Sequence, residues 1–243
     1  MISEAQLQQQ LALQQLETEL LLGVDFIPVS PNANQSFEPQ ISPNPDENSQ
    51  TLDALREQVI ADFPLCDSLS DATQPVFGEG SETARLMFIG EAPGAEEDKT
   101  GRPFVGAAGQ KLEQMITAMG LDRDEVYITN ILKARPPGNR TPTQEEVEAS
   151  APYLIRQIEL IRPEVIVTLG GPSTKFILQS TEGITRIRGR WASYESDSLR
   201  IPVMPTFHPA YLLRNYTRDT RQQMWSDLRK VMEMLGLQPK KNT

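Results

Sequence analysis

Four short apolar runs, each followed by glycine or polar residues, constrain the fold of this chain most strongly. They occupy 85–90, 126–131, 164–169 and 201–206. Segments with helical periodicity lie before, between and after them, at about 52–61, 109–119, 144–160, 173–179 and 218–235. Short strands that alternate with helices indicate an α/β domain with a mainly parallel sheet.

The carboxyl ends of such strands are where α/β proteins bind their ligands. The segments that follow the four predicted strands are 90–104, 130–140, 170–173 and 207–214. Residues that carry chemistry are therefore expected in these four segments.

Charge is distributed unevenly along the 243 residues. The net charge of −10 argues by itself against a nucleic-acid partner, because proteins that bind polyanions are usually basic. Residues 1–83, however, carry 14 acidic groups and one basic group, whereas residues 84–243 carry 22 basic and 19 acidic groups. The acidity belongs to the N-terminal third, and the remainder can meet a polyanion on one face.

The N-terminal third also predicts the domain organisation. Leucines at near-helical spacing indicate a helix within 1–23, which either binds a partner, not identified by the sequence, or lies loose or folded against the domain. Residues 24–51 are rich in Pro, Asn and Ser and are expected to form a disordered linker. The predicted domain spans 52–237 and is followed by a short tail, 238–243.

The chain contains a single cysteine, Cys66, which can form neither an internal disulfide nor, alone, a thiolate metal site. No apolar run approaches the roughly 18–20 residues that span a bilayer, and the first residues lack the basic and apolar regions of a signal peptide. We expect a cytoplasmic monomer without a membrane partner.

Four acids follow the first predicted strand: Glu91, Glu96, Glu97 and Asp98. Carboxylates crowded at a sheet end hold hydrogen-bond donors, bind a cation or do acid–base work. The alternative is a solvated acidic loop.

His208, the only histidine, follows the fourth predicted strand, precedes a proline and lies six residues before Arg214. Histidine is well suited to donating a proton or hydrogen bond near neutral pH, so this position favours function over a structural role. Asn130 ends the second predicted strand, and its amide offers an acceptor and a donor that match N3–H and O4 of uracil. The loop after it carries Lys133, Arg135 and Arg140, either as phosphate contacts or as an ordinary basic surface.

Three separate stretches resemble the motifs of family 4 uracil-DNA glycosylases, in the family's order. They read GEAPGAEEDKTGRPFVGAAG at 90–109, VYITNILKARPPGNRTPT at 126–143 and HPAYLLR at 208–214, where the family usually has Ser in place of Ala210. The resemblance covers about 52–235. It implies a three-layer α/β/α fold with a central, mainly parallel four-stranded sheet.

The resemblance also implies an activity: hydrolysis of the N-glycosidic bond of deoxyuridine in DNA, after the nucleotide is flipped into a pocket. By position, Phe104 would stack on uracil, Asn130 would read its amide edge and His208 would lie near O2 and stabilise the departing anion. Three further residues would line the pocket, namely Glu91, Ala92 and Glu97. The expected catalytic residues are His208, Glu97 and Glu91; Ala92 cannot activate water, so Glu97 or Glu91 positions it, or the sugar cation needs little help.

The same resemblance implies the DNA contacts. The segment Tyr211, Leu212, Leu213 and Arg214 would enter or press on the duplex beside the vacated base. Arg135 and Arg140 would contact phosphates.

The sequence departs from the family at the four cysteines that usually hold a [4Fe–4S] cluster. The matching positions are Ile60, Phe63, Ala134 and Ser150, and Cys66 does not substitute for any of them. We expect no cluster, no other cofactor and no metal, with Ile60 and Phe63 filling the cluster's volume. Two rival functions remain: a DNA-binding module that has lost catalysis, and an α/β enzyme that acts on free nucleotides.

Overall fold

The computed structural model describes residues 51–238. The predicted helix in 1–23, almost all of the predicted linker and most of the predicted tail lie outside these residues and stay predictions.

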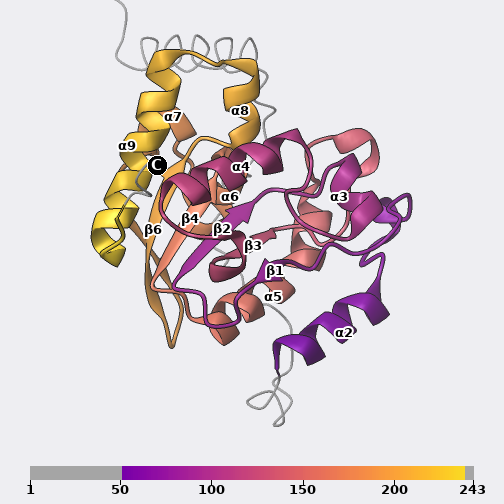
Figure 1. The fold of residues 1–243 in the computed structure, drawn as a ribbon. Coiled ribbons are helices and arrows are strands. Elements are labelled where there is room, and N and C mark those ends of the chain that lie inside the picture. The colour runs from indigo at the N-terminus through magenta and orange to yellow at the C-terminus, as the bar shows by residue number, and fades with distance from the viewer. Residues whose placement is uncertain (1–50, 239–243) are drawn as a thin grey trace, which may run out of the picture. The chain divides into compact units, whose positions relative to one another are not determined.

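A single sheet of six strands forms the centre of the domain (Figure 1). Its spatial order is β1-β3-β2-β4-β6-β5. The strands are β1 (Glu79–Gly80), β2 (Leu86–Gly90), β3 (Tyr127–Asn130), β4 (Val165–Leu169), β5 (Ala192–Glu195) and β6 (Arg200–Thr206). The four predicted strands are present as β3, β2, β4 and β6, and they pair in parallel.

The predicted count of four strands is wrong, because an antiparallel strand is added at each edge of the sheet. β1 pairs with β3, and β5 pairs with β6. β1 is only two residues long, and β5 is partly exposed and half polar, so neither has the apolar run by which the four inner strands were recognised.

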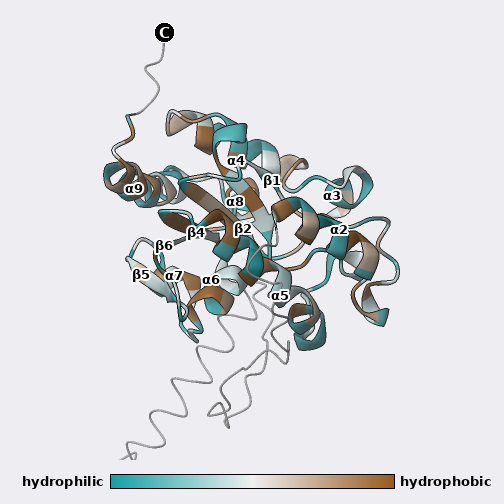
Figure 2. Cartoon of the chain, turned by 90° about the horizontal axis from the view of Figure 1, so that it is seen from below, coloured by the Kyte–Doolittle hydropathy of each residue, from teal (hydrophilic) through white to brown (hydrophobic). Residues whose placement is uncertain are grey.

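Helices cover both faces of this sheet, as the predicted three-layer fold requires (Figures 1 and 2). They are α2 (Leu52–Asp62), α3 (Ala95–Thr100), α4 (Ala107–Ala118), α5 (Gln144–Ile161), α6 (Gly171–Leu178), α7 (Ile184–Ile187), α8 (Pro209–Arg214) and α9 (Arg218–Leu235). Short 3-10 turns lie at Asp67–Leu69, Arg123–Glu125 and Pro137–Asn139. Within residues 51–238, no helix is both long and apolar enough to cross a membrane.

Successive residues of β2 point to opposite faces of the sheet, and this alternation makes the three layers. Met87 and Ile89 pack in one apolar cluster with buried residues of α2, α5 and α6. Leu86 and Phe88 pack in a second cluster with buried residues of α4 and α9. The inner strands are therefore buried on both sides, which explains their continuous apolar sequence.

Local sequence signals fix the helix ends. The Thr143 side chain accepts a hydrogen bond from the backbone N–H of Glu146, and the Glu146 side chain accepts one from the backbone N–H of Thr143, which makes a capping box at the start of α5. Thr51 and Thr217 cap α2 and α9 in the same way with their hydroxyls.

Candidate active site

The carboxyl ends of β2 and β3 meet at a point where only glycine fits. Gly90 is paired in register with Asn130. A Cβ atom on Gly90 would lie 2.3 Å from Asn130 Oδ1 and 2.5 Å from Phe104 Cζ. The structure thus brings the predicted stacking ring and the predicted amide to the same strand end.

The end of β4 receives His208 in a similar close approach. A Cβ atom on Gly170, whose φ is +94°, would lie 3.1 Å from the Cβ of His208. The rings of His208 and Phe104 have centroids 5.6 Å apart, with an angle of 30° between their planes. Phe104, Asn130 and His208, which are far apart in the sequence, therefore lie close together at the carboxyl ends of the inner parallel strands. We call this end of the sheet, which is distinct from its edge strands, the sheet edge.

Asn130 carries an unmet hydrogen bond. Its side chain is buried, with 2% of the residue exposed, and its Oδ1 atom has no hydrogen-bond partner among the described residues. A buried polar atom without a partner costs free energy in the folded state, so such an atom at a strand end points to a ligand. The ligand must present a hydrogen-bond donor.

Two side chains, those of Glu97 and Arg123, hydrogen-bond to the backbone of the loop that carries Phe104. Glu97 Oε1 accepts hydrogen bonds from the backbone N–H groups of Val105 and Gly106, both at 2.9 Å. Arg123 donates to the carbonyl oxygen of Phe104 at 3.2 Å and also to that of Pro103. Phe104 itself has φ +50°, a left-handed conformation that this bonding maintains. The ring is thus fixed before any ligand binds, and Glu97 acts by holding the loop.

His208 is held as a neutral hydrogen-bond donor. Its Nδ1 atom accepts a hydrogen bond from the backbone N–H of Ala210 at 3.1 Å, as the N-cap of α8. The pKa of His208 is lowered to about 4, mainly by burial and also by repulsion from Arg214, while Glu97 acts in the opposite direction. At neutral pH the proton of the imidazole therefore lies on Nε2, which is the atom able to donate to a ligand.

Glu91 is the titratable carboxyl of this edge. Burial raises its pKa to about 7, and no hydrogen bond to its side chain is present among the described residues. A carboxyl with a pKa near neutrality can exchange a proton at physiological pH. Ala92 beside it is partly buried against the apolar cluster of α2 and α5 and offers only a methyl group.

The remaining acids of the loop have structural partners. Glu96 pairs with Lys99 at 2.8 Å on the surface. Asp98 is buried and accepts hydrogen bonds from the backbone N–H and the hydroxyl of Thr73. Within residues 51–238, no group of three or more potential metal ligands comes together.

The cations of the 133–140 loop are engaged within the protein. Arg140 donates to both carboxylate oxygens of Glu146, at 2.6 and 2.9 Å. Arg135 donates to Asn139 Oδ1 at 2.6 Å, with Asp98 3.7 Å away. Their predicted phosphate contacts stay untested, but both guanidinium groups already have partners.

Lys133 is fully buried, so the suggestion that it contacts phosphate is wrong. Its Nζ atom donates three hydrogen bonds of 2.7 Å each, to Thr129 Oγ1, the backbone oxygen of Asn130 and Gln157 Oε1. Burial lowers its pKa well below the usual value. Lys133 thus fixes the end of β3 and the backbone of Asn130, a role that its place in a basic loop did not reveal.

The predicted duplex-contacting segment forms α8, and its residues differ in exposure. Leu212 is 4% exposed and belongs to the apolar core, whereas Leu213 is 46% exposed. The Tyr211 ring stacks on Phe207 at 4.6 Å, and Arg214 is exposed. Of the two leucines of this segment, Leu213 is the exposed one, and its predicted contact with a duplex stays a prediction.

The residues at the four cluster positions do not fit an iron–sulfur cluster. None of them supplies a thiolate: Ala134 and Ser150 are buried, and the Ser150 hydroxyl accepts a hydrogen bond of 3.4 Å from the backbone N–H of Lys133. Phe63 is partly buried against the core, and its predicted filling of the cluster's volume stays a prediction. Ile60 is 51% exposed, so the expectation that it fills the cluster's volume is wrong.

A polar network joins the same segments that these positions occupy. Glu146 Oε1 accepts from the Ser68 hydroxyl at 2.8 Å and from Arg140, while Oε2 accepts from Arg140 and from the Thr143 N–H at 2.8 Å. We call Ser68, Arg140, Thr143 and Glu146 the Glu146 clasp. It connects the 3-10 turn after α2, the loop after β3 and the first turn of α5.

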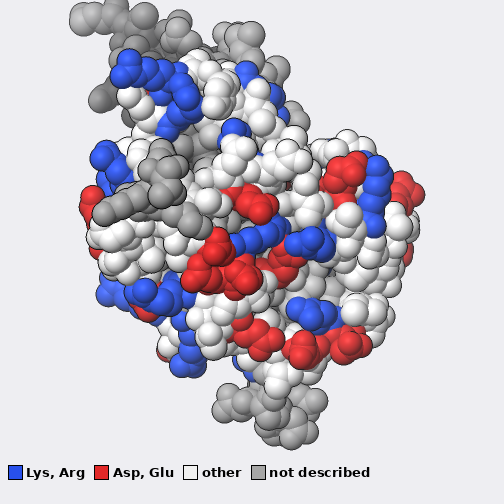
Figure 3. Space-filling model, in the orientation of Figure 1, with Lys and Arg blue, Asp and Glu red and all other residues white. Residues whose placement is uncertain are grey.

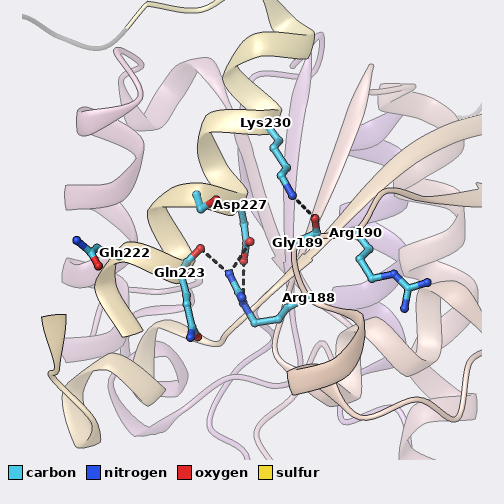
Figure 4. Close-up of a pocket in the computed structure, with 8 residues that line it drawn as sticks. Arg188, Gly189, Arg190, Gln222, Gln223, Asp227 and Lys230 are labelled. Atoms are coloured by element: carbon cyan, nitrogen blue, oxygen red, sulfur yellow. Dashed lines mark hydrogen bonds and ion pairs between the residues drawn. The ribbon is translucent and has the colours of Figure 1, made fainter. Parts of the chain in front are cut away.

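A surface cavity of about 430 Å³ lies elsewhere, between α9 and the turn that precedes β5 (Figure 4). In it, Arg188 points toward Asp227 and hydrogen-bonds to it at 2.6 and 3.1 Å, and Lys230 donates to the backbone oxygen of Gly189. None of the predicted site residues lines this cavity. Its one acidic group, Asp227, is already paired with Arg188, so the cavity is a weaker candidate site than the sheet edge.

An aromatic ring, a buried amide oxygen and a neutral imidazole thus lie together where the parallel strands of an α/β domain end, an arrangement suited to a planar base. The chain belongs to the uracil-DNA glycosylase superfamily, whose family model (Uracil DNA glycosylase superfamily) matches residues 77–229. It is 45% identical to a type-4 uracil-DNA glycosylase of Sulfurisphaera tokodaii over 79% of this chain and 88% of that protein. It is also 45% identical to the type-4 enzyme of Archaeoglobus fulgidus, over 77% and 94% of the two chains, and 32% identical to a type-5 enzyme of Pyrobaculum aerophilum, over 67% and 77%.

Proposed function

We propose that this chain hydrolyses the bond between uracil and deoxyribose in DNA, releasing uracil and leaving an abasic site for base excision repair. Family membership supports the reaction class, since its relatives along most of the chain are named uracil-DNA glycosylases. The observation that carries the proposal within this molecule is the buried, unpartnered Oδ1 atom of Asn130 beside the ring of Phe104.

That atom favours uracil over cytosine. Uracil presents N3–H to an acceptor, whereas N3 of cytosine is itself an acceptor and would leave two lone pairs facing each other. The amide NH₂ of Asn130 can donate to O4 of uracil, but it faces an amino group in cytosine. A site whose buried polar groups are matched only by one base discriminates strongly against the other.

The chemistry needs little more than a positioned donor and a water. The C1′–N1 bond breaks, and its electron pair leaves with uracil as an anion delocalised onto O2. Water adds its oxygen to C1′ and gives up a proton, for which Glu91 is the candidate acceptor because its pKa is about 7. The Nε2–H group of His208 is the candidate donor to the anion, and a neutral donor preorganised in a water-poor site stabilises such a charge.

We also propose that the chain works without an iron–sulfur cluster. The residues at the four family positions supply no thiolate, and the Glu146 clasp joins the segments that carry them. Protein purified without exposure to oxygen is expected to be colourless. Stoichiometric iron and sulfide with visible absorption would contradict this part of the proposal.

The test of the proposed activity uses duplex oligonucleotides that differ at one base. The full chain is incubated with DNA containing uracil, cytosine or thymine at that position, and abasic product is detected by alkaline strand cleavage. Cleavage of the uracil strand alone is expected. Free deoxyuridine serves as a control for the nucleotide-enzyme alternative, and tight binding without abasic product would favour the binding-module alternative.

A further inference from the structure

The cations of this domain fall into two groups. Many arginines contact an acidic side chain within 4 Å, including Arg85, Arg102, Arg123, Arg135, Arg140 and Arg188. Four cations of α4, α8 and the first turn of α9 have no such partner among residues 51–238, namely Lys111, Arg214, Arg218 and Arg221. A cation without an acidic partner keeps its full charge for an external anion.

Tyr216 lies among these cations and organises two of them. Its side chain belongs to the most exposed large apolar groups of the domain, at 59%. The Lys111 ammonium lies 5.2 Å from the ring centroid and the Arg221 guanidinium lies 4.8 Å from it. Two like charges repel each other, so a shared aromatic ring is a device that keeps them close. We call Lys111, Arg214, Tyr216, Arg218 and Arg221 the cationic corner.

The cationic corner is continuous with the candidate site. α4, which carries Lys111, begins directly after the loop that holds Phe104, and it packs against α8. α8 begins at its cap His208 and ends at Arg214, whose charge is close enough to lower the pKa of His208. In Figure 3, blue side chains predominate at the top of the molecule, where Figure 1 places α8 and the start of α9.

We propose that the cationic corner binds phosphates of the DNA strand next to the nucleotide in the pocket. This inference rests on the proposed function and extends it to a surface. The charge favours a polyanion, and the position beside His208 is where the strand must continue once its uracil is in the site. The acid closest in sequence, Asp219, accepts a hydrogen bond from Gln223 at 2.8 Å and does not pair with the cations.

According to this inference, the main phosphate contacts lie in the cationic corner and not in the 133–140 loop. There, Arg140 would have to leave Glu146 before it could bind a phosphate, which costs the hydrogen bonds of a buried carboxylate. Among residues 51–238, the Lys111 ammonium donates one hydrogen bond, to Gln114 Oε1 at 2.8 Å, and the Arg221 guanidinium lies over the Tyr216 ring without an ion pair. The cations of the corner can therefore bind phosphate without breaking an ion pair.

The test is the salt dependence of binding to a uracil-containing duplex, measured by fluorescence anisotropy with the full chain. The double variant Lys111→Gln/Arg221→Gln is expected to reduce the slope of log K against log salt by about 2, because each lost phosphate contact contributes about 0.9. The single-turnover cleavage rate at saturating protein should stay within about twofold of wild type, because both residues lie outside the pocket.

The matched control is Arg229→Gln. It removes the same charge from the same helix, about 12 Å further along the axis than Arg221, and Arg229 is also exposed without an acidic partner. The control should leave the slope unchanged. A second control combines Arg229→Gln with Lys175→Gln and so removes two charges, as the double variant does. The inference would be overturned if the double variant had the wild-type slope, or if this second control reduced the slope as much as the double variant.

A second pair of variants tests the ring. Tyr216→Phe keeps the aromatic face and should bind as wild type, whereas Tyr216→Ala should weaken binding by roughly two- to fivefold, in line with exposed cation–π energies. Wild-type affinity in Tyr216→Ala would show that the ring does not organise the cations. If the wild-type chain binds DNA with the expected slope but does not cleave at uracil, the proposed function is wrong and the DNA-binding role of the cationic corner is retained. If it cleaves and the variants bind as wild type, only the role of the cationic corner is wrong.

Discussion

The sheet edge and the Glu146 clasp differ in whether their polar groups have hydrogen-bond partners. At the sheet edge, Asn130 Oδ1 is buried and the Glu91 carboxyl is partly buried, and neither has a hydrogen-bond partner within residues 51–238. In the clasp, Glu146 is fully buried and both of its oxygens accept two hydrogen bonds each. Unmet groups destabilise a fold unless a ligand completes them, whereas met groups stabilise it.

The difference separates residues that serve a ligand from residues that serve the fold. Substitutions that remove an unmet polar group at the sheet edge should change the reaction and leave the stability of the chain equal or higher. Substitutions in the clasp should do the reverse. Each variant below is therefore measured twice, by single-turnover cleavage and by thermal or denaturant unfolding.

The largest effect is expected for His208→Ala. Loss of a donor that acts mainly on the departing anion lowers the rate by a factor on the order of 10²–10³, about 3–4 kcal/mol. DNA binding should change much less, since the phosphate contacts remain. A wild-type cleavage rate in His208→Ala would refute the catalytic assignment of this residue.

Because the pKa of His208 is about 4, its imidazole stays neutral between pH 8 and pH 6. The NMR signals of this single histidine should therefore not titrate over that range, and protonation of His208 should not alter the rate there. Titration of these signals near pH 6.5 would show that the side chain is more accessible to water than its burial indicates.

Asn130→Asp is expected to follow in size. The substitution places a second acceptor opposite O4 of uracil, so the rate on uracil should fall by roughly 10- to 100-fold, and discrimination against cytosine should weaken or disappear. The readout is the ratio of cleavage rates on uracil and cytosine duplexes. Unchanged uracil cleavage together with continued rejection of cytosine would place base recognition elsewhere.

Glu146→Ala should act on stability alone. The variant leaves Arg140 and Ser68 without their buried acceptor and should lower the free energy of unfolding by about 2–3 kcal/mol at pH 7, with a near-wild-type cleavage rate at a temperature where it is folded. Glu148→Ala, on an exposed position of the same helix, is the matched control and should cost under about 0.5 kcal/mol.

The pH dependence of the clasp has a definite sign. Burial raises the pKa of Glu146, but hydrogen bonds from Arg140, Thr143 and Ser68 outweigh it and hold the pKa below its usual value. Its stabilising effect is thus present at neutral pH and is lost as pH falls below the normal range of a glutamate. The difference in unfolding free energy between wild type and Glu146→Ala should shrink in acid, and a constant difference would contradict this account.

Glu91→Gln should give the smallest change in stability, and in the opposite direction. Because burial raises the pKa of Glu91 to about 7, the folded chain holds a proton there that the unfolded chain has lost above pH 4.5, and stability falls as pH rises through that window. Removing the charge should stabilise the chain by about 1–2 kcal/mol at pH 8 and little at pH 5. The cleavage rate should fall at the same time; a stabilised variant with full activity would exclude Glu91 as the proton acceptor.

Much of the fold was predictable because the inner strands and long helices obey simple patterns. β2, β3, β4 and β6 were recognised as apolar runs, and the predicted helix at 218–235 has the bounds of α9. The strand ends then indicated where Asn130 and His208 would meet. Backbone direction and side-chain alternation determine these features locally, so a linear pattern contains them.

The parts that the sequence did not predict depend on partners distant in the chain. The edge strands β1 and β5 are defined by what they pair with, and Leu212 differs from Leu213 only in the face of α8 that it occupies. In the same way, a cationic loop cannot reveal that Arg140 is held by Glu146 or that Lys133 points inward. A sequence shows how many Lys and Arg side chains a segment carries, and only the structure shows which of them lack an acidic partner.

The Glu146 clasp has a consequence for how such a protein is made and kept in a cell. The clasp consists of carboxylate, guanidinium and hydroxyl groups, so it forms when its segments fold. Its formation requires neither iron nor sulfide. Oxidants that dismantle iron–sulfur centres have nothing to attack in it, and what weakens it is acid or concentrated salt. The strength of the clasp therefore depends on pH and ionic strength.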